Sequence, residues 1–125
     1  MAIVGIGTDL ARIARFKKLQ APDDKLLLRL FTAGEREYAL AKRDPAPHLA
    51  ARFAAKEAFL KALGTGLRQG LSWQQVEVVR DELGCPGLVL TGVAATLLAE
   101  RGACHAHLSY SHDGDYAVAT VVLEA

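Results

Sequence analysis

The chain has 125 residues, 51% of them hydrophobic, and its formal net charge is +1 at pH 7. This length suits one compact unit with a modest core, so we expect a single domain over residues 1–125. The high apolar content excludes a disordered chain, and the near-zero charge gives no bulk attraction to nucleic acid. We therefore expect a folded protein without a nucleic-acid partner, whose function depends on local groups of charges.

Cysteine usage and the amino terminus indicate the compartment. Cys85 and Cys104 lie far apart without a CxxC or Cys/His metal spacing, which argues against a zinc knuckle and a disulfide-built scaffold. The first residues, MAIVGIGTDL, lack a basic leader, and no apolar run approaches the roughly 18 residues of a membrane span. We expect a soluble, unprocessed, cytoplasmic protein with no membrane partner.

The amino-terminal segment predicts a strand followed by a helix. Residues 2–6 read as a short buried strand, and residues 11–19 as a helix with its apolar side chains on one side. Asp9 stands between them, where an aspartate ordinarily serves as a helix N-cap. A carboxylate pointing outward would instead suit Mg²⁺, which prefers oxygen ligands, and the residues alone leave both alternatives open. The first two helices are basic, through Arg12, Arg15, Lys17, Lys18, Lys25 and Arg29.

Further helices and then strands follow along the chain. One helix starts after Pro22–Asp24, a second runs from a Thr32–Glu35 capping box to about Lys42, and a third follows the Asp44–Pro47 break. We expect strands at residues 75–80, 87–91, 105–111 and 116–123, and one more helix at 93–101. The fold class is therefore α+β, with a mostly antiparallel sheet that carries helices on one face.

The stretch Arg52–Gly66, RFAAKEAFLKALGTG, departs from an ordinary amphipathic helix. At roughly 100° per residue, Lys56 falls inside the apolar stripe of this helix. A surface ion pair between Glu57 and Lys61, and a lysine whose stem covers apolar surface, are the ordinary explanations. Together with Arg52, however, these side chains could hold a metal ion through Glu57 and phosphate oxygens through the cations.

Two turns carry further candidates. Gly64-Thr65-Gly66 ends the helix as a C-cap and would let a ligand approach the backbone closely. His112 follows Ser111 at the end of a strand, and it is either a hydrogen-bonded surface group or a phosphate contact. A serine nucleophile is excluded here because no acid is placed to orient the imidazole and no Gly-x-Ser-x-Gly elbow is present. Glu35 has its capping-box role, and it could also reach a metal-bound water.

Three segments of the sequence together resemble the holo-[acyl-carrier-protein] synthase family, the small type of 4′-phosphopantetheinyl transferase. They are Gly5–Asp9 (GIGTD), Arg52–Gly66, and Ser109–His112 (SYSH) with Ala117 and Ala119 after it. The similarity spans essentially the whole chain, and the order and spacing of the segments make it specific. It implies transfer of phosphopantetheine from coenzyme A to a serine of apo acyl carrier protein, in support of fatty-acid biosynthesis.

The same resemblance assigns roles to residues. It implies Mg²⁺ held by Asp9 and Glu57, and a homotrimer with active sites at subunit interfaces. Arg12 and Arg15 would dock the carrier protein. Contacts to coenzyme A would come from Arg52, Lys56, Lys61, Gly64, Thr65, Gly66, Ser111 and His112. Glu57 is the first candidate for the base that removes the serine proton, and Glu35 acting through water is the second.

A rival interpretation is a non-catalytic module that binds coenzyme A or a carrier protein. Two metal ligands argue against that interpretation, because binding alone would not need both.

Overall fold

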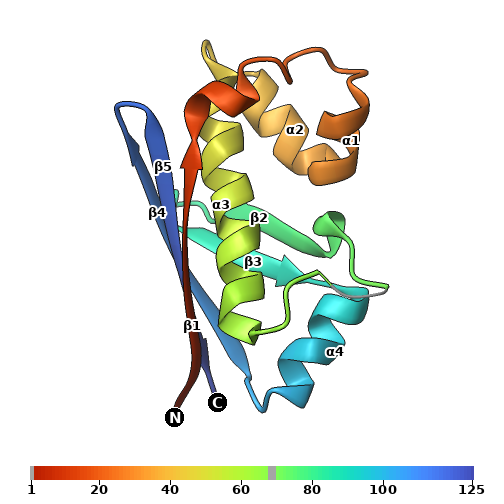
Figure 1. The fold of residues 1–125 in the computed structure, drawn as a ribbon, viewed down its shortest axis with the longest axis vertical. Coiled ribbons are helices and arrows are strands. Elements are labelled where there is room, and N and C mark those ends of the chain that lie inside the picture. The colour runs from red at the N-terminus through yellow and green to blue at the C-terminus, as the bar shows by residue number, and fades with distance from the viewer. Residues whose placement is uncertain (1, 68–69) are drawn as a thin grey trace.

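The computed structural model describes residues 2–67 and 70–125 (Figure 1). In chain order the elements are β1 (Ile3–Arg12), the 3-10 helix η1 (Ile13–Phe16), α1 (Lys25–Leu30), α2 (Ala33–Leu40), α3 (Pro45–Leu63), the 3-10 helix η2 (Trp73–Gln75), β2 (Val76–Arg80), β3 (Pro86–Leu90), α4 (Gly92–Glu100), β4 (His105–Asp113) and β5 (Tyr116–Glu124). Among these residues, no helix is both long enough and apolar enough to cross a membrane.

The strands form two antiparallel sheets. One has the order β1-β5-β4, so the last strand lies in the centre between the first and the fourth. The other is the hairpin β2-β3. The helix α3 runs along one face of the three-stranded sheet, and no described helix covers the opposite face (Figure 1). The predicted α+β class with helices on one face is confirmed, although the expected sheet is divided into two.

Burial follows the pleat of the three-stranded sheet and surrounds α3. In β5, Ala117, Ala119, Val121 and Leu123 are buried, whereas the residues between them are exposed or half-buried. This alternation of period two defines an inner face that packs on α3. The other sides of α3 pack against α2, β2 and η1. Because α3 is enclosed in this way, even charged residues of the helix are buried.

Two predictions about the amino-terminal segment are wrong. The strand does not end at residue 6 but continues to Arg12, because it pairs with β5 as far as Arg12 opposite Tyr116. Asp9 therefore lies within a strand and caps no helix. The helix expected at residues 11–19 is reduced to the single turn η1, although its apolar residues Ile13, Phe16 and Leu19 are buried.

The predicted helix ends agree more closely with the structure. Thr32 and Glu35 form a complete capping box at the start of α2. Gly64 ends α3 with a φ of 78°, a left-handed conformation that favours glycine. Helix α3 starts at Pro45 with Asp44 as its N-cap, so the predicted Asp44–Pro47 break is in fact the first turn of the helix.

Candidate functional site

Asp9 and Lys61 come together from the first strand and the end of the long helix. Asp9 lies on the inner face of β1, and its side chain is 16% exposed. The Lys61 ammonium donates to Asp9 Oδ1 over 3.0 Å, and the lysine side chain itself is 55% exposed. The pair is thus anchored at its acidic end and open to solvent at its basic end.

Two glycines explain how α3 approaches β1 so closely. A Cβ atom added to Gly7 would overlap the Ala58 carbonyl oxygen and would lie 2.6 Å from the Ala62 nitrogen. A Cβ atom at Gly5 would overlap the Ala62 carbonyl oxygen. Only glycine allows such an approach between two backbones. The Gly-Ile-Gly sequence before Asp9 therefore seats the helix directly on the strand, which brings Lys61 within reach of the carboxylate.

Glu57 lies one helical turn before Lys61 and is half-buried. Burial raises the pKa of Glu57 above its ordinary range, and the nearby negative charge of Asp9 raises it further. Lys61 and Arg15 act in the opposite direction but do not cancel these effects. The site therefore holds two mutually repelling carboxylates that share one lysine, an arrangement that an added cation would stabilise.

The Asp9–Glu57 pair fits Mg²⁺ by its chemistry. Mg²⁺ is commonly held by one or two carboxylates together with waters and substrate phosphates. Over residues 2–67 and 70–125, no cluster of three or more His, Cys, Asp and Glu side chains could form an all-protein metal site. A divalent ion bound here would therefore take part of its coordination from a phosphorylated ligand.

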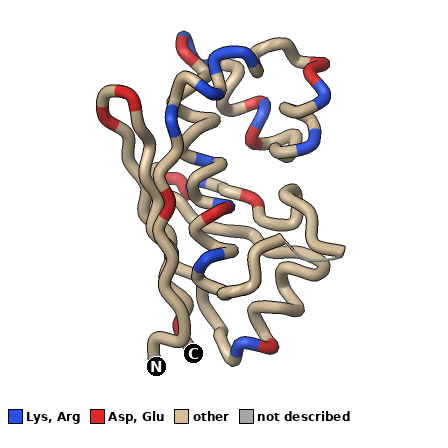
Figure 2. The backbone as a smooth tube through the Cα atoms, in the orientation of Figure 1, with Lys and Arg blue, Asp and Glu red and all other residues tan. Residues whose placement is uncertain are grey.

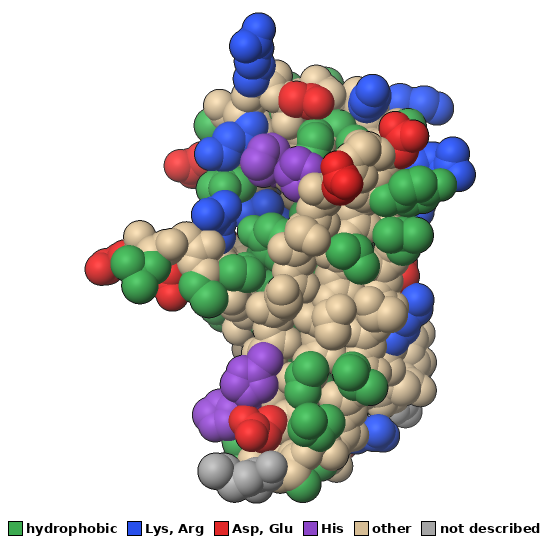
Figure 3. Space-filling model, turned by 90° about the vertical axis from the view of Figure 1, so that its left-hand side faces the viewer, with side chains coloured by type: hydrophobic (Ala, Val, Ile, Leu, Met, Phe, Trp, Pro, Cys, Tyr) green, Lys and Arg blue, Asp and Glu red, His purple; other side chains and the backbone are tan. Residues whose placement is uncertain are grey.

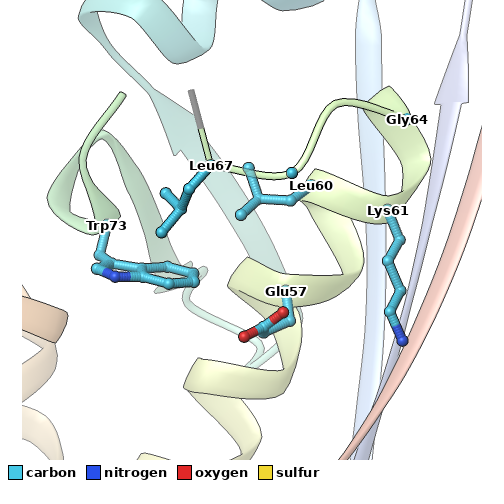
Figure 4. A pocket seen from close by; sticks show the side chains of 7 residues that line it. Glu57, Leu60, Lys61, Gly64, Leu67 and Trp73 are labelled. Atoms are coloured by element: carbon cyan, nitrogen blue, oxygen red, sulfur yellow. The ribbon is translucent and has the colours of Figure 1, made fainter. Parts of the chain in front are cut away.

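A cavity of about 460 Å³ opens beside these charged groups (Figure 4). The indole of Trp73 and the side chains of Leu60 and Leu67 face the same space, and Glu57 lies at its edge. Its lining, among the residues that the structure describes, is Glu57, Leu60, Lys61, Gly64, Gly66, Leu67 and Trp73. Thr65 lies instead at a smaller pocket beside α4. The cavity thus combines a charged rim with an apolar interior.

Lys56 and Glu35 are not part of this site, contrary to the expectation from sequence. Both side chains are fully buried and form an ion pair of 2.8 Å. Lys56 also donates to the carbonyl oxygens of Trp73 and Val76, over 2.9 and 2.7 Å. All three of its donors are used, so none is available to a phosphate. Burial is the main cause that lowers the pKa of Lys56, while the Glu35 charge opposes this shift.

The carboxylate of Glu35 is equally occupied. Its Oε1 accepts from the Thr32 amide over 2.8 Å, and its Oε2 accepts from the Val78 amide over 2.7 Å. With 1% of the residue exposed, Glu35 has no path to a water in the cavity. The structure therefore contradicts its candidacy as a base.

Arg52 belongs to a separate group of cations on the far side of α3. Its guanidinium lies 4.1 Å from the centre of the Tyr38 ring, and it donates to the His48 carbonyl oxygen over 3.3 Å. Its buried Nε has no hydrogen-bond partner among the described residues. Further basic side chains lie near the rings of Tyr38 and His48. We call the whole group the Tyr38 cluster: Tyr38, Lys42, His48, Arg52, Arg80 and His112.

The Tyr38 cluster contains Lys42, Arg52 and Arg80, and the pocket that the two arginines line also contains Glu35 and Glu77. Burial lowers the pKa of His48, and the charges of Arg52, Lys42, His112 and Arg80 lower it further. The His112 ring lies 6.1 Å from that of His48, at the end of β4. His112 and Arg52 are thus brought together as expected, but away from the cavity beside Glu57. Ser111 is exposed and pairs with Val118, and it lines neither the cavity nor the described pockets near it.

Basic side chains flank the carboxylates on the side of η1. Lys and Arg gather at the end of the molecule formed by η1, α1, α2 and the turns between them, where Asp and Glu also occur (Figure 2). Arg15 lies over the rings of Phe16 and Phe53, 5.8 and 5.7 Å from their centres, and its charge acts on Glu57. Arg12 is exposed at the end of β1 and donates to the Tyr116 hydroxyl over 3.2 Å. This surface could receive an acidic partner next to the cavity.

Several residues of this region could not be found from the sequence. Trp73 and Leu67 carry no motif, and only the folded chain shows that they face Glu57. Tyr38 and Arg80 are 42 positions apart in the chain, yet their side chains are hydrogen-bonded. Lys42 and His48 are single basic residues in segments that the sequence predicts to be helical. Isolated aromatic and basic residues of this kind give no periodic signal.

Comparison with known proteins defines the class. A family model described as the 4′-phosphopantetheinyl transferase superfamily matches residues 5–121, and the chain belongs to this superfamily. Among its relatives is the holo-[acyl-carrier-protein] synthase of Syntrophotalea carbinolica, 61% identical over 121 residues that cover 96% of this chain and 94% of that protein. The enzyme of the same name from Trichlorobacter lovleyi is 54% identical and is covered to 98%, as is this chain.

Solved structures agree with the fold. The holo-[acyl-carrier-protein] synthase of Neisseria meningitidis superposes with a TM-score of 0.86 at 35% identity, over 99% of this chain and all of that one. A Bacillus anthracis holo-(acyl-carrier-protein) synthase in complex with CoA (3′,5′-ADP) gives a TM-score of 0.80 at 38% identity, over 98% and 97% of the two chains. The resemblance inferred from three sequence segments is confirmed.

Proposed function

We propose that the chain transfers 4′-phosphopantetheine from coenzyme A to a serine of apo acyl carrier protein, as a holo-[acyl-carrier-protein] synthase. The observation that carries this proposal is the meeting of Asp9, Glu57 and Lys61 beside an apolar cavity, in a chain 61% identical to a protein of that name. The alternative, a binding module, has no use for two repelling carboxylates, Glu57 at the rim of the cavity and Asp9 bound to its neighbour Lys61.

In this reaction the serine oxygen forms a bond to the pantetheine-side phosphorus of the coenzyme A pyrophosphate. The bond from that phosphorus to the bridging oxygen breaks, and adenosine 3′,5′-bisphosphate leaves with the electron pair. Glu57, at the edge of the cavity, accepts the serine proton. The exposed ammonium of Lys61 balances charge on the pyrophosphate. Mg²⁺ held by Asp9 and Glu57 would supply the remaining charge neutralisation.

The carrier protein would dock on the basic surface that contains Arg12 and Arg15. This surface ends at Arg15, whose charge already acts on Glu57. An acidic partner bound there would present its serine next to the base. Complementary charge of this kind speeds association and sets orientation.

We further propose a homotrimer whose active sites form between subunits. The outer face of the three-stranded sheet exposes large apolar side chains, with Ile6 at 66%, Leu10 at 59% and Val118 at 38% exposure. In Figure 3, which looks at this side of the molecule, apolar and neutral surface occupies most of the face, and charges lie mainly at its margins. A face of this kind suits burial against further copies of the chain.

The separation of the charged groups also supports a shared site. Asp9, Glu57 and Lys61 lie at one region of the monomer, and the Tyr38 cluster lies at another. Coenzyme A carries a 3′-phosphate and a 5′-pyrophosphate on its ribose, so one subunit could bind the pyrophosphate while the cluster of its neighbour binds the 3′-phosphate. We place the reaction in the cytoplasm, in support of fatty-acid biosynthesis.

Intact-mass spectrometry tests the proposed reaction. The protein is incubated with coenzyme A, MgCl₂ and apo carrier protein, and the carrier should gain the mass of one phosphopantetheine. The control is a carrier whose acceptor serine is replaced by alanine, which should gain nothing. If coenzyme A stays intact and the carrier unlabelled, the binding module is the better interpretation.

Oligomeric state is tested separately by light scattering after size exclusion. Val118→Asp places a charge on the outer sheet face and should convert a trimer to smaller species. Val89→Asp, at an exposed position of β3 away from this face, is the matched control. A wild-type protein that elutes as a monomer would refute the trimer.

A further inference from the structure

The buried Lys56–Glu35 pair has no role in the proposed reaction, yet it lies next to the site. Lys56 precedes Glu57 in α3, and its ammonium bonds to the Trp73 carbonyl oxygen at the start of η2. The side chain of Trp73 points to the cavity, and its indole ring forms part of the wall. One buried side chain therefore joins the helix that carries the base to the segment that carries the wall.

The pair holds this segment at several points. Lys56 bonds to the carbonyl oxygens of Trp73 and Val76, which lie at the two ends of η2. Glu35 bonds to the Val78 amide two residues further on, and through its other oxygen to the Thr32 amide at the start of α2. The ion pair thus fixes η2 and β2 relative to α2 and α3 at once.

Stability alone is a poor reason for such a pair. Burying two charges costs solvation free energy that their attraction only partly returns, and well-packed apolar residues of similar size often stabilise a protein at least as well. Hydrogen bonds to charged groups do, however, impose direction and distance on their partners. A fully buried lysine with three fixed acceptors defines a position more sharply than apolar packing would.

The Trp73 ring, which the ion pair holds in place, forms a wall that suits an uncharged part of the ligand. The Trp73 ring packs against Phe53 of the core, with 5.1 Å between the ring centres, and on its cavity side it faces Leu60 and Leu67. Among the residues that the structure describes, Glu57 and Lys61 are the charged ones that line it. The 3′-phosphorylated adenosine needs cations, which the Tyr38 cluster offers elsewhere. The pantetheine arm is neutral and largely aliphatic, and it leaves the pyrophosphate from the side opposite to the adenosine.

We propose that Lys56 and Glu35 are positioning residues that hold Trp73 as a wall of the channel for the pantetheine arm of coenzyme A. This inference rests on the proposed function, because it takes coenzyme A as the ligand. Among the expected contacts to coenzyme A, it assigns Gly64 and Gly66, which line the same cavity, to the arm. The pair acts on the arm through η2 and leaves the adenosine end untouched.

Tryptophan fluorescence gives a direct readout, because Trp73 is the only tryptophan of the chain. Coenzyme A and dephospho-coenzyme A, which both carry the arm, should change the Trp73 emission on binding. Adenosine 3′,5′-bisphosphate, which lacks the arm, should bind with little change in emission. A bisphosphate response as large as that of coenzyme A would overturn the assignment of the cavity.

The double variant Lys56→Met/Glu35→Gln removes both charges together and so leaves no buried ion unpaired. It should raise the KM for coenzyme A by about tenfold or more, the scale expected when a positioning group is displaced. The inhibition constant of adenosine 3′,5′-bisphosphate should stay within about twofold, since no contact to the adenosine end is lost. Equal changes in both constants would reject a role specific to the arm.

Two further variants separate positioning from general destabilisation. Leu123→Ala deletes buried side-chain volume in β5 and should lower the melting temperature without this split between the two constants. Trp73→Ala should raise the KM for coenzyme A and leave the inhibition constant of adenosine 3′,5′-bisphosphate unchanged, even if the double variant fails to fold. Trp73→Phe keeps an aromatic wall, so its rise in KM should be smaller. If Trp73→Ala leaves the KM for coenzyme A unchanged while the wild type labels its carrier, the inference fails and the proposed function stands. If the wild type labels no carrier, the proposed function fails first.

Discussion

Replacing Gly7 by alanine tests whether the close contact between β1 and α3 sets the chemistry. The new Cβ atom would overlap the carbonyl oxygen of Ala58 and would lie 2.6 Å from the Ala62 nitrogen. Both obstacles are helix backbone, so no side chain can turn aside. The helix must move away from the strand by roughly 1 Å to restore ordinary contact.

That displacement has two separable consequences. Overpacking of a well-filled interior typically costs about 1–3 kcal/mol of unfolding free energy. The same movement carries Glu57 and Lys61 away from Asp9, because they belong to the helix and Asp9 belongs to the strand. A misplacement of about 1 Å at reacting groups can lower turnover by roughly a hundredfold. We therefore expect a folded protein with a large loss of kcat.

Carrier labelling measured by mass spectrometry gives the rate, and thermal unfolding gives the stability. Gly87→Ala in β3 is the matched control, since its Cβ atom would meet Val79 at an ordinary 4.0 Å. This variant should keep kcat close to that of the wild type. A Gly7→Ala protein that is destabilised but turns over within about twofold of the wild type would refute the reasoning, because a shift of this size would then be harmless to the site.

Three further predictions follow from the charges. Glu57→Gln should lower kcat by about a hundredfold or more through loss of the base and a metal ligand, without lowering the melting temperature, and near-normal turnover would refute both roles. Because burial and Asp9 raise the pKa of Glu57, this carboxyl should titrate above the ordinary glutamate range in protein stripped of divalent cations. NMR of ¹³C-labelled glutamate should show that pKa moving down in Asp9→Asn, and a fixed pKa would contradict the repulsion. Arg15→Glu should raise the KM for carrier protein more than that for coenzyme A, whereas Arg101→Glu, the same charge reversal beyond α4, should change neither; equal effects of Arg15→Glu on both substrates would reject docking there.

Much of the fold could be predicted because its signals are local. The Thr32–Glu35 capping box, the glycine at the end of α3 and the β2-β3 hairpin all depend on residues close in the chain. The length of β1 could not be predicted in this way. Its residues after Ile6 are extended only because β5, more than a hundred positions later, pairs with them.

The sequence predicts which residue types form the candidate site, but it does not predict which of these residues are buried. Periodicity places Lys56 within an apolar stripe, and such a stripe predicts a helix that buries one face only. In the structure α3 is enclosed on nearly every side, so Arg52 and Lys56 are buried, and of these four charged side chains Glu57 and Lys61 reach the cavity. Which edge of such a helix is open depends on the elements packed around it, and no spacing within the helix records that.

The central place of β5 has a consequence for how the protein folds during its synthesis. Thr8 donates its hydroxyl to the Ala119 carbonyl oxygen across 111 positions of sequence, and the segments at the two ends of the chain lie side by side (Figure 1). A ribosome releases β1 first and β5 last, so the strand that carries Asp9 has no neighbour in its sheet until nearly the whole chain has emerged. The α3 segment, with its closely spaced contacts, is free to form earlier. In the nascent chain we expect Glu57 and Lys61 to lie on a formed helix before the strand of Asp9 has paired with β5. The site that binds coenzyme A would therefore form no earlier than the last step of folding.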